Sequence, residues 1–240
     1  NIQELLQILG FGSRDAYLDS EDTIREKAKY MMDHYVSQIF PGGFKAQIIA
    51  NSRIAAVRYK RMIEDALKAK IEELENNNPL SINIDRLRKV RAAVVISGDR
   101  NDELEIKQYT DTNYHKRSIK SFKLPFDGED EETPTIKGDV GIIIVNNMLT
   151  TGFDAPIEQV LYLDRVLVAH NLLQAITRPN RVGEEGKDFG FVVDYVGIGH
   201  HLKKAIDYYD EKQGQVDTDE TDGTLSTIVN EEELLKELKN

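Results

Sequence analysis

The sequence of 240 residues contains no cysteine. The absence of thiols excludes a disulfide framework, an iron–sulfur cluster and a cysteine nucleophile, and it fits a reducing compartment. Long hydrophobic runs are absent too: the apolar stretch 140–145 has the length of a strand, whereas a membrane helix needs about 20 residues. We therefore expect a soluble, cytoplasmic chain with no membrane span. Because it begins at Asn1 without a signal region, we also expect a fragment.

Basic side chains are in deficit, with 31 Lys and Arg against 42 Asp and Glu and a net charge of −11. The excess acid lies in two places. Asp127 and residues 129–132 contribute −5, and residues 216–240 contribute −6, so that the rest of the chain is balanced. A local basic groove is therefore compatible with this composition, and the net charge does not exclude a nucleic-acid partner.

Short apolar stretches alternate with stretches of helical periodicity. The predicted strands are residues 44–50, 91–96, 140–145, 159–163 and 188–196. The predicted helices are residues 22–39, 52–75, 114–123, 171–181 and 230–239. Continuous apolar strands separated by helices are typical of a parallel sheet with helices on both faces. We therefore predict an α/β domain over residues 41–198, with lead-in helices or a linker in 1–40 and a helical extension with an acidic tail in 199–240.

Gln174, Arg178 and Arg181 are the most informative group of polar residues. On a helix they would fall within a narrow arc, so that an amide and two guanidiniums point the same way. Two arginines near the end of a parallel sheet suit a phosphate, although an exposed face paired with carboxylates is the alternative. Pro179 lies between them and removes a helix hydrogen bond, so we expect the helix to kink or end near Arg178.

A second group follows the strand at 140–145. Gly152 permits close approach of the backbone, the Thr151 hydroxyl suits a phosphate, and Asp154 can accept from a ribose hydroxyl or orient a cation. Taken alone, this pattern also fits an ordinary turn between a strand and a helix.

Taken in order, residues 151–156, 161–164, 174–181 and 190–195 resemble motifs V and VI of superfamily 2 helicases. The flanking residues are most similar to the motor (R) subunit of type I restriction enzymes. The strand at 45–51 with Ser52 and Arg53 is similar to that family's motif IV, and Ser97 lies where related helicases carry another nucleic-acid-contacting loop. The resemblance covers about residues 40–200. One departure is Thr150-Thr151, where Leu-Thr is more usual.

The resemblance implies a second RecA-like motor domain that faces a first one across an ATP cleft. Arg178 and Arg181 would then act as arginine fingers on the γ-phosphate, with Arg181 the preferred one. The residues implied to line the nucleotide or couple it to DNA are Gly152, Asp154 and Gln174. The residues implied to contact phosphates of double-stranded DNA are Ser52, Arg53, Ser97 and Thr151. Such contacts carry no sequence information, as a translocating motor requires.

The phosphate-binding half of an ATP site is missing from the sequence. No Gly-x-x-x-x-Gly-Lys-Ser/Thr loop is present, and Gly186-Lys187 is more typical of a turn. ATP and Mg would thus be bound mainly by a first motor domain outside this chain, and we expect the isolated chain to be inactive. We assign it no metal site, since His200 and His201 are adjacent and would diverge on a helix.

The implied partners are the first RecA-like domain of the same polypeptide, the backbone of double-stranded DNA, and the modification and specificity subunits of a restriction complex. No membrane partner is expected. Two alternatives stay open: a non-enzymatic α/β interaction module derived from a degenerate motor, and half of an RNA helicase.

Overall fold

A computed structural model describes residues 13–77, 81–149, 153–167, 169–177, 179, 187 and 189–197. The predicted helix at 230–239 and the acidic tail lie outside the described residues. None of the described helices is long and apolar enough to cross a lipid bilayer.

Five strands form one parallel sheet in the order β2-β3-β1-β4-β5. They are β1 (Lys45–Ile49), β2 (Arg91–Val95), β3 (Val140–Val145), β4 (Glu158–Leu163) and β5 (Phe191–Asp194). Every neighbouring pair is parallel, and at the centre Ile48 of β1 lies opposite Ile144 and Tyr162. All five predicted strands are confirmed. The last is shorter than the predicted 188–196, because only its four central residues pair with β4.

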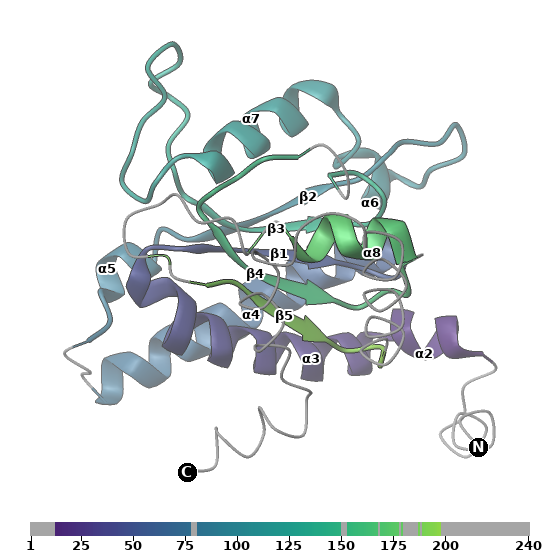
Figure 1. The fold of residues 1–240 in the computed structure, drawn as a ribbon, viewed down its shortest axis with the longest axis horizontal. Coiled ribbons are helices and arrows are strands. Elements are labelled where there is room, and N and C mark those ends of the chain that lie inside the picture. Colours follow the sequence, from purple (N-terminus) through teal and green to yellow (C-terminus); the bar gives the residue numbers. More distant parts are fainter. Residues whose placement is uncertain are drawn as a thin grey trace, which may run out of the picture.

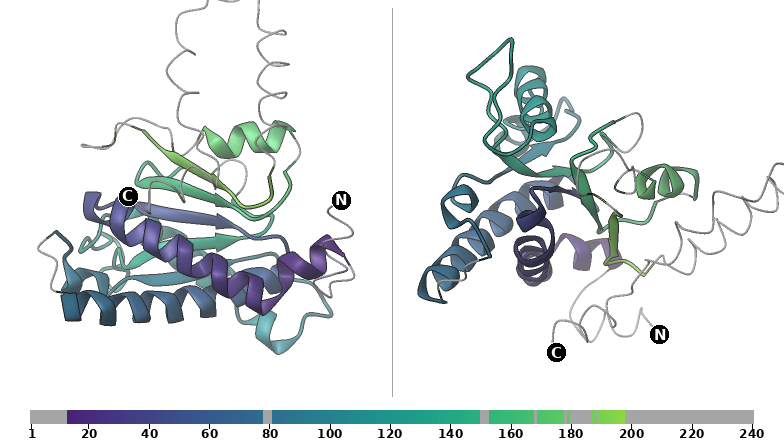
Figure 2. Two further views of the ribbon diagram at one scale, coloured as in Figure 1. Left: turned by 90° about the horizontal axis from the view of Figure 1, so that it is seen from below. Right: turned by 60° about the vertical axis from the view of Figure 1, so that its left-hand side comes forward.

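Helices cover both faces of the sheet, so the fold is the predicted α/β class (Figures 1 and 2). One face carries α3 (Glu21–His34) and α4 (Arg53–Asn77), which lie side by side, and the other carries α7 (Thr112–Lys123) and α8 (Ala169–Ile176). The remaining helices are short: α2 (Arg14–Asp19), α5 (Ile84–Leu87) and α6 (Leu104–Lys107).

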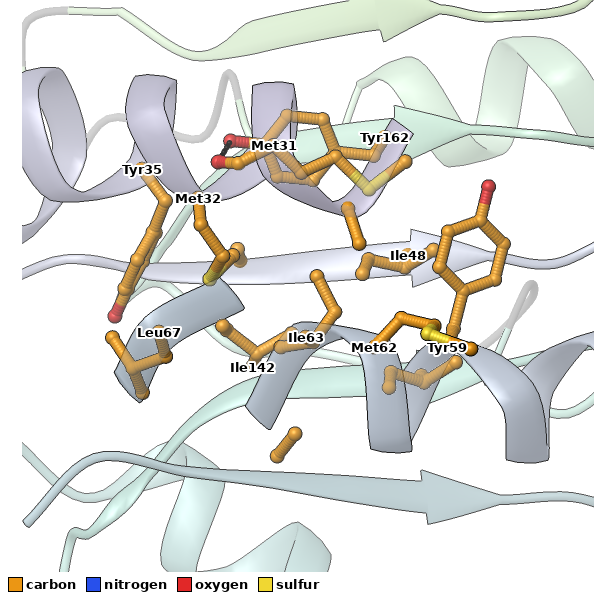
Figure 3. Packing of buried hydrophobic residues seen from close by; sticks show 14 of the residues in the cluster. Met31, Met32, Tyr35, Ile48, Tyr59, Met62, Ile63, Leu67, Ile142 and Tyr162 are labelled. Atoms are coloured by element: carbon orange, nitrogen blue, oxygen red, sulfur yellow. Dashed lines mark hydrogen bonds between the residues drawn. The ribbon is translucent and has the colours of Figure 1, made fainter. Parts of the chain in front are cut away.

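Helix α3 belongs to the core although it precedes the first strand. The Ser20 side chain accepts a hydrogen bond from the Thr23 amide and so caps the helix. Its buried apolar side chains, some of which Figure 3 shows, are Ile24, Ala28, Met31 and Met32. The helix continues as a π-helical turn (Tyr35–Ile39) and a 3₁₀ turn (Phe40–Gly42), which ends at Gly43 with a φ of 81°.

The long helix α4 completes this half of the core. Its buried face includes Tyr59, Met62, Ile63 and Leu67, which pack toward α3 and the central strands (Figure 3). Burying an apolar side chain of this size contributes roughly 1.5–3 kcal/mol. The α3 and α4 faces are therefore the main source of stability on this side of the sheet.

Two segments differ from the predicted elements. The segment 101–109, where no helix or strand is predicted, contains the single-turn helix α6, which does not join the sheet. The helix predicted to reach Arg181 ends at Ile176. The expectation that Pro179 would end the helix near Arg178 agrees with this boundary, and Arg178 and Arg181 lie outside the described residues.

Candidate functional site

The carboxyl ends of the five strands meet at one edge of the sheet, because the strands are all parallel. This edge lies at the right of Figure 1, where α2 and α6 are also found. The predicted residues Ser52 and Arg53 follow β1, and Ser97 follows β2. Loops at the carboxyl edge are where open α/β sheets bind their ligands.

Arg53 joins the loops that follow β1 and β2. Its Nη1 donates to the Ser97 carbonyl oxygen at 3.1 Å and to the Asp102 carboxylate at 2.6 and 2.7 Å. The neighbouring Ser52 accepts from the Ala55 amide at 3.0 Å through its side-chain oxygen, which fixes the first turn of α4. The structure therefore brings together three of the residues predicted to contact DNA, although two loops supply them.

Asp102 is the acceptor that holds this junction, and its side chain is buried. Its Oδ2 also accepts from the Asp99 amide at 2.6 Å. The Asp99 amide first, and then the Arg53 guanidinium, hold the pKa of Asp102 below its ordinary value. The carboxylate is therefore ionised at neutral pH and stays paired with Arg53.

Two further side chains tie the end of β3 to its neighbours. The buried Asn146 donates through Nδ2 to the carbonyl oxygens of Ala50 and Asn51, at 2.9 and 3.0 Å. Arg165, just after β4, donates through Nη1 to the Asn146 carbonyl oxygen at 3.1 Å and also to the Asn147 side chain. The ends of β1, β3 and β4 are therefore held in fixed relative positions.

Helix α2 lies against the same edge. The Asn51 side chain donates to Asp19 Oδ1 at 3.1 Å, and Arg14 donates to the Val196 carbonyl oxygen at 2.5 Å, so α2 contacts the ends of both β1 and β5. A polar hollow of about 410 Å³ opens beside it. Its lining residues are Arg14, Asp15, Leu18, Asp19, Asn51, Ser52, Arg165 and Val166.

A buried charged network lies at the end of β4, next along the chain to Arg165 of the hollow's lining. Asp164, the residue after β4, accepts from Lys27 Nζ at 2.5 Å and from the Tyr59 hydroxyl at 2.6 Å, and its side chain is fully buried. Burial raises the pKa of Asp164, while Lys27 and Tyr59 act to lower it. The network links α3, α4 and the end of β4, and it explains how the lead-in helix is fixed to the sheet.

The remaining predicted residues are distributed differently. Asp154 is exposed between the buried Phe153 and Ala155, and Gln174 is half-buried on α8, over the α7 face of the sheet. The residues Thr151, Gly152, Arg178 and Arg181 lie outside the described residues. The structure thus places five of the nine predicted site residues, and it brings Ser52, Arg53 and Ser97 together.

Lys187 does not belong to this edge. Its Nζ donates to the carbonyl oxygens of Pro156 and Glu158, at 2.7 and 2.6 Å, near the start of β4 and therefore at the opposite edge of the sheet. A second buried lysine, Lys45, donates to the Ser121 and Gly138 carbonyl oxygens, and burial lowers its pKa to about 7.

Sequence reasoning missed several residues at the candidate site. Asn146 and Asp164 directly follow strands, so their positions in the sequence carry a usable signal. No such signal exists for Lys27 or Asp102, whose partners are 137 and 49 residues away along the chain.

The side chains at this edge can be compared with the groups that ATP and its metal ion need. Within the described ranges, no group of three or more His, Cys, Asp or Glu side chains is placed to hold a metal ion. Among the described residues, the arginines that make hydrogen bonds at the carboxyl edge include Arg14, Arg53 and Arg165. Cationic donors of this kind fit the phosphates of a nucleotide or of DNA, whereas the metal would need ligands from elsewhere.

Comparison with known proteins gives one consistent result. Residues 42–197 match the family model described as type I restriction enzyme subunit R domain 3. The chain is 33% identical over 196 residues to the MjaVIIIP endonuclease subunit of Methanocaldococcus jannaschii, named as part of a type I restriction enzyme; the match covers 80% of this chain and 17% of that protein. It is 29% identical over 206 residues to the type I restriction enzyme HindI endonuclease subunit of Haemophilus influenzae, with coverages of 84% and 17%.

Among solved structures, the chain is similar to a fragment of an HsdR subunit of a type I restriction enzyme from Vibrio vulnificus. The TM-score is 0.48 at 18% identity, and the match covers 88% of this chain and 32% of that one. The chain spans about a sixth of the length of the two curated relatives described above.

Proposed function

Because the chain belongs to the domain 3 family of type I restriction enzyme R subunits, we propose that it is the second RecA-like motor domain of such a subunit, with the sheet within residues 41–198 and helix α3 packed onto it. In this proposal the intact subunit is an ATP-dependent DNA translocase. The observation that carries the proposal is the junction at the carboxyl edge, where Arg53 joins the loops after β1 and β2 beside Ser52 and Ser97.

The proposed DNA-contacting residues are Ser52, Arg53, Ser97 and Thr151. Hydroxyl and guanidinium donors fixed at strand ends suit phosphate oxygens, which repeat along DNA regardless of sequence. A motor that moves along DNA needs such uniform contacts. The hydrogen bonds of Asn146 and Arg165 support this assignment, because they hold the ends of β1, β3 and β4 in fixed relative positions.

The proposed nucleotide residues are Gly152, Asp154, Gln174, Arg178 and Arg181. ATP with its Mg²⁺ would be held mainly by the first RecA-like domain of the same polypeptide. When bound there, ATP would supply the terminal phosphoryl group that is transferred to water. Arg178 and Arg181 would neutralise the charge that develops on that group, as arginine fingers do. The further partners in this proposal are the modification and specificity subunits of the restriction complex.

The proposal is tested by comparing ATP turnover of this chain with that of the whole R subunit. We expect no DNA-stimulated hydrolysis by the 240-residue chain, and clear hydrolysis by the intact subunit. Turnover by the isolated chain that co-purifies with it and disappears in the Arg181→Ala variant would contradict the assignment of the ATP-binding half to another domain.

A further inference from the structure

The three contacts of the Arg53 guanidinium all use one of its nitrogens. Nη1 meets both oxygens of Asp102 and the carbonyl oxygen of Ser97. Within the part of the chain that the structure describes, neither Nε nor Nη2 of Arg53 donates a hydrogen bond, and 29% of the Arg53 side chain is exposed. One arm of the guanidinium is therefore fixed, and the edge formed by Nε and Nη2 is available to a ligand.

Asp102 is itself fixed by the loop that carries it. Its side chain is only 3% exposed, and the Asp99 amide donates to it at 2.6 Å. The Asp99 side chain in turn accepts from the Asn101 amide at 3.1 Å, which closes a tight turn. A carboxylate held in this way cannot follow Arg53 if the guanidinium moves, so it sets the orientation of the guanidinium.

We propose that Asp102 is a positioning residue, which orients Arg53 so that its Nε and Nη2 bind one phosphate of the DNA backbone. This inference rests on the proposed function, since DNA supplies the phosphate. A guanidinium has five donors in one plane, and its Nε and Nη2 hydrogens are parallel, a geometry that matches two oxygens of a phosphate. With Nη1 engaged by Asp102, the side chain has lost much of its rotational freedom before DNA binds, which reduces the entropic cost of the contact.

A simple charge argument predicts the opposite effect for Asp102. If its carboxylate only neutralised Arg53, removing it would strengthen DNA binding, because the local positive charge would rise. The sign of the change in affinity therefore separates positioning from neutralisation.

The experiment measures the affinity of the intact R subunit for a duplex of about 30 base pairs, between 50 and 200 mM salt, the range over which phosphate contacts are strongly screened. The variants are Arg53→Ala, Asp102→Asn, Asp102→Glu and the double variant Arg53→Ala with Asp102→Asn. The matched control is Asp99→Asn. It removes a negative charge near Arg53 from a side chain that makes no hydrogen bond with Arg53, and it keeps an oxygen that accepts from the Asn101 amide.

We expect Arg53→Ala to weaken binding about tenfold at low salt and to reduce the slope of log K against log salt by about 0.9, the effect of one lost phosphate contact. Asp102→Asn should weaken binding to a similar degree, and the double variant should bind no more weakly than Arg53→Ala. Asp102→Glu keeps the charge but displaces the guanidinium, so it should also weaken binding. Asp99→Asn should bind at least as tightly as the wild type.

Tighter binding by Asp102→Asn, or wild-type binding by Asp102→Glu, would overturn the proposal. If Asp102→Asn lowers the melting temperature too far for measurement, Asp102→Glu decides the question. Wild-type affinity and slope in Arg53→Ala would also overturn it, and would remove Arg53 from the proposed DNA contacts without deciding whether the intact subunit is an ATP-dependent motor. The proposed function fails in a different way, through the absence of DNA-stimulated ATP turnover by the wild-type R subunit.

Discussion

Replacing Lys27 by Met should be among the most destabilising single changes in the chain. Met fills much of the space of the lysine stem but leaves the carboxylate of Asp164 buried without its cation. The 2.5 Å pair has side chains that are 11% and 0% exposed. Removing one partner of a buried pair typically costs about 3–5 kcal/mol, because the other charge stays desolvated.

The assay is urea denaturation of the 240-residue chain, followed by circular dichroism. The control is Lys29→Met on the same helix, since Lys29 pairs with Glu26 at 2.7 Å but both side chains are more than half exposed. This exposed pair should contribute at most about 1 kcal/mol. The double variant Lys27→Met with Asp164→Asn should regain most of the loss, because the Asn oxygen still accepts from the Tyr59 hydroxyl and no charge is buried.

Acid should reduce the cost of Lys27→Met. Burial raises the pKa of Asp164, and Lys27 opposes this effect, so without Lys27 the folded pKa rises further. A carboxyl group with a raised folded pKa contributes most to stability below its unfolded pKa and loses that contribution as the pH rises through the folded pKa. The gap between variant and wild type should therefore narrow on acidification. A loss below about 1 kcal/mol at neutral pH, equal to that of Lys29→Met, would refute the reasoning.

Two further predictions concern the lead-in helix. Burial lowers the pKa of His34 to about 4. The neutral imidazole therefore contributes roughly 3 kcal/mol to the stability of the fold above its unfolded pKa of about 6.5, and this contribution should be lost as the pH falls through 4. Replacing it in His34→Asn should flatten the dependence of the melting temperature on pH. A chain trimmed to residues 42–197, the limits of the family match, should fail to give a cooperative thermal transition, because the buried face of α3 and the partner of Asp164 are removed; a cooperative melt near the wild-type temperature would contradict this.

The strands could be predicted from the sequence because parallel strands buried on both faces are continuously apolar. Val140–Val145 is the clearest case, and its predicted limits match those of β3. The short helices α5 and α6 could not be predicted, since each is a single turn without a hydrophobic period. Helix α7 begins two residues before the predicted start, where the Asp111 side chain accepts from the Tyr114 amide.

The sequence predicted which loops carry the candidate site, but not the contacts between those loops. The resemblance to helicase motifs indicated Ser52, Arg53 and Ser97, and the parallel sheet brings the loops that carry them to one edge. The ion pairs that orient them depend on distances in space, so Asp102 and Lys27 gave no pattern in the sequence. The apolar residues of α3 recur at helical spacing, which predicted a buried helix face. Nothing in the sequence indicated which face of the sheet this helix would cover.

The central claim is that this chain supplies arginine fingers to an ATP site shared with another domain, and Arg181→Ala in the intact R subunit tests it most directly. DNA-stimulated ATP turnover should fall by about 10³- to 10⁵-fold, with nucleotide binding and melting temperature retained. Arg181→Lys should restore little, because an ammonium does not reproduce the planar guanidinium. The control is Arg88→Ala, which removes an exposed arginine paired with Glu75 and Asp85 and should leave turnover unchanged. Near-normal turnover in Arg181→Ala would contradict the account.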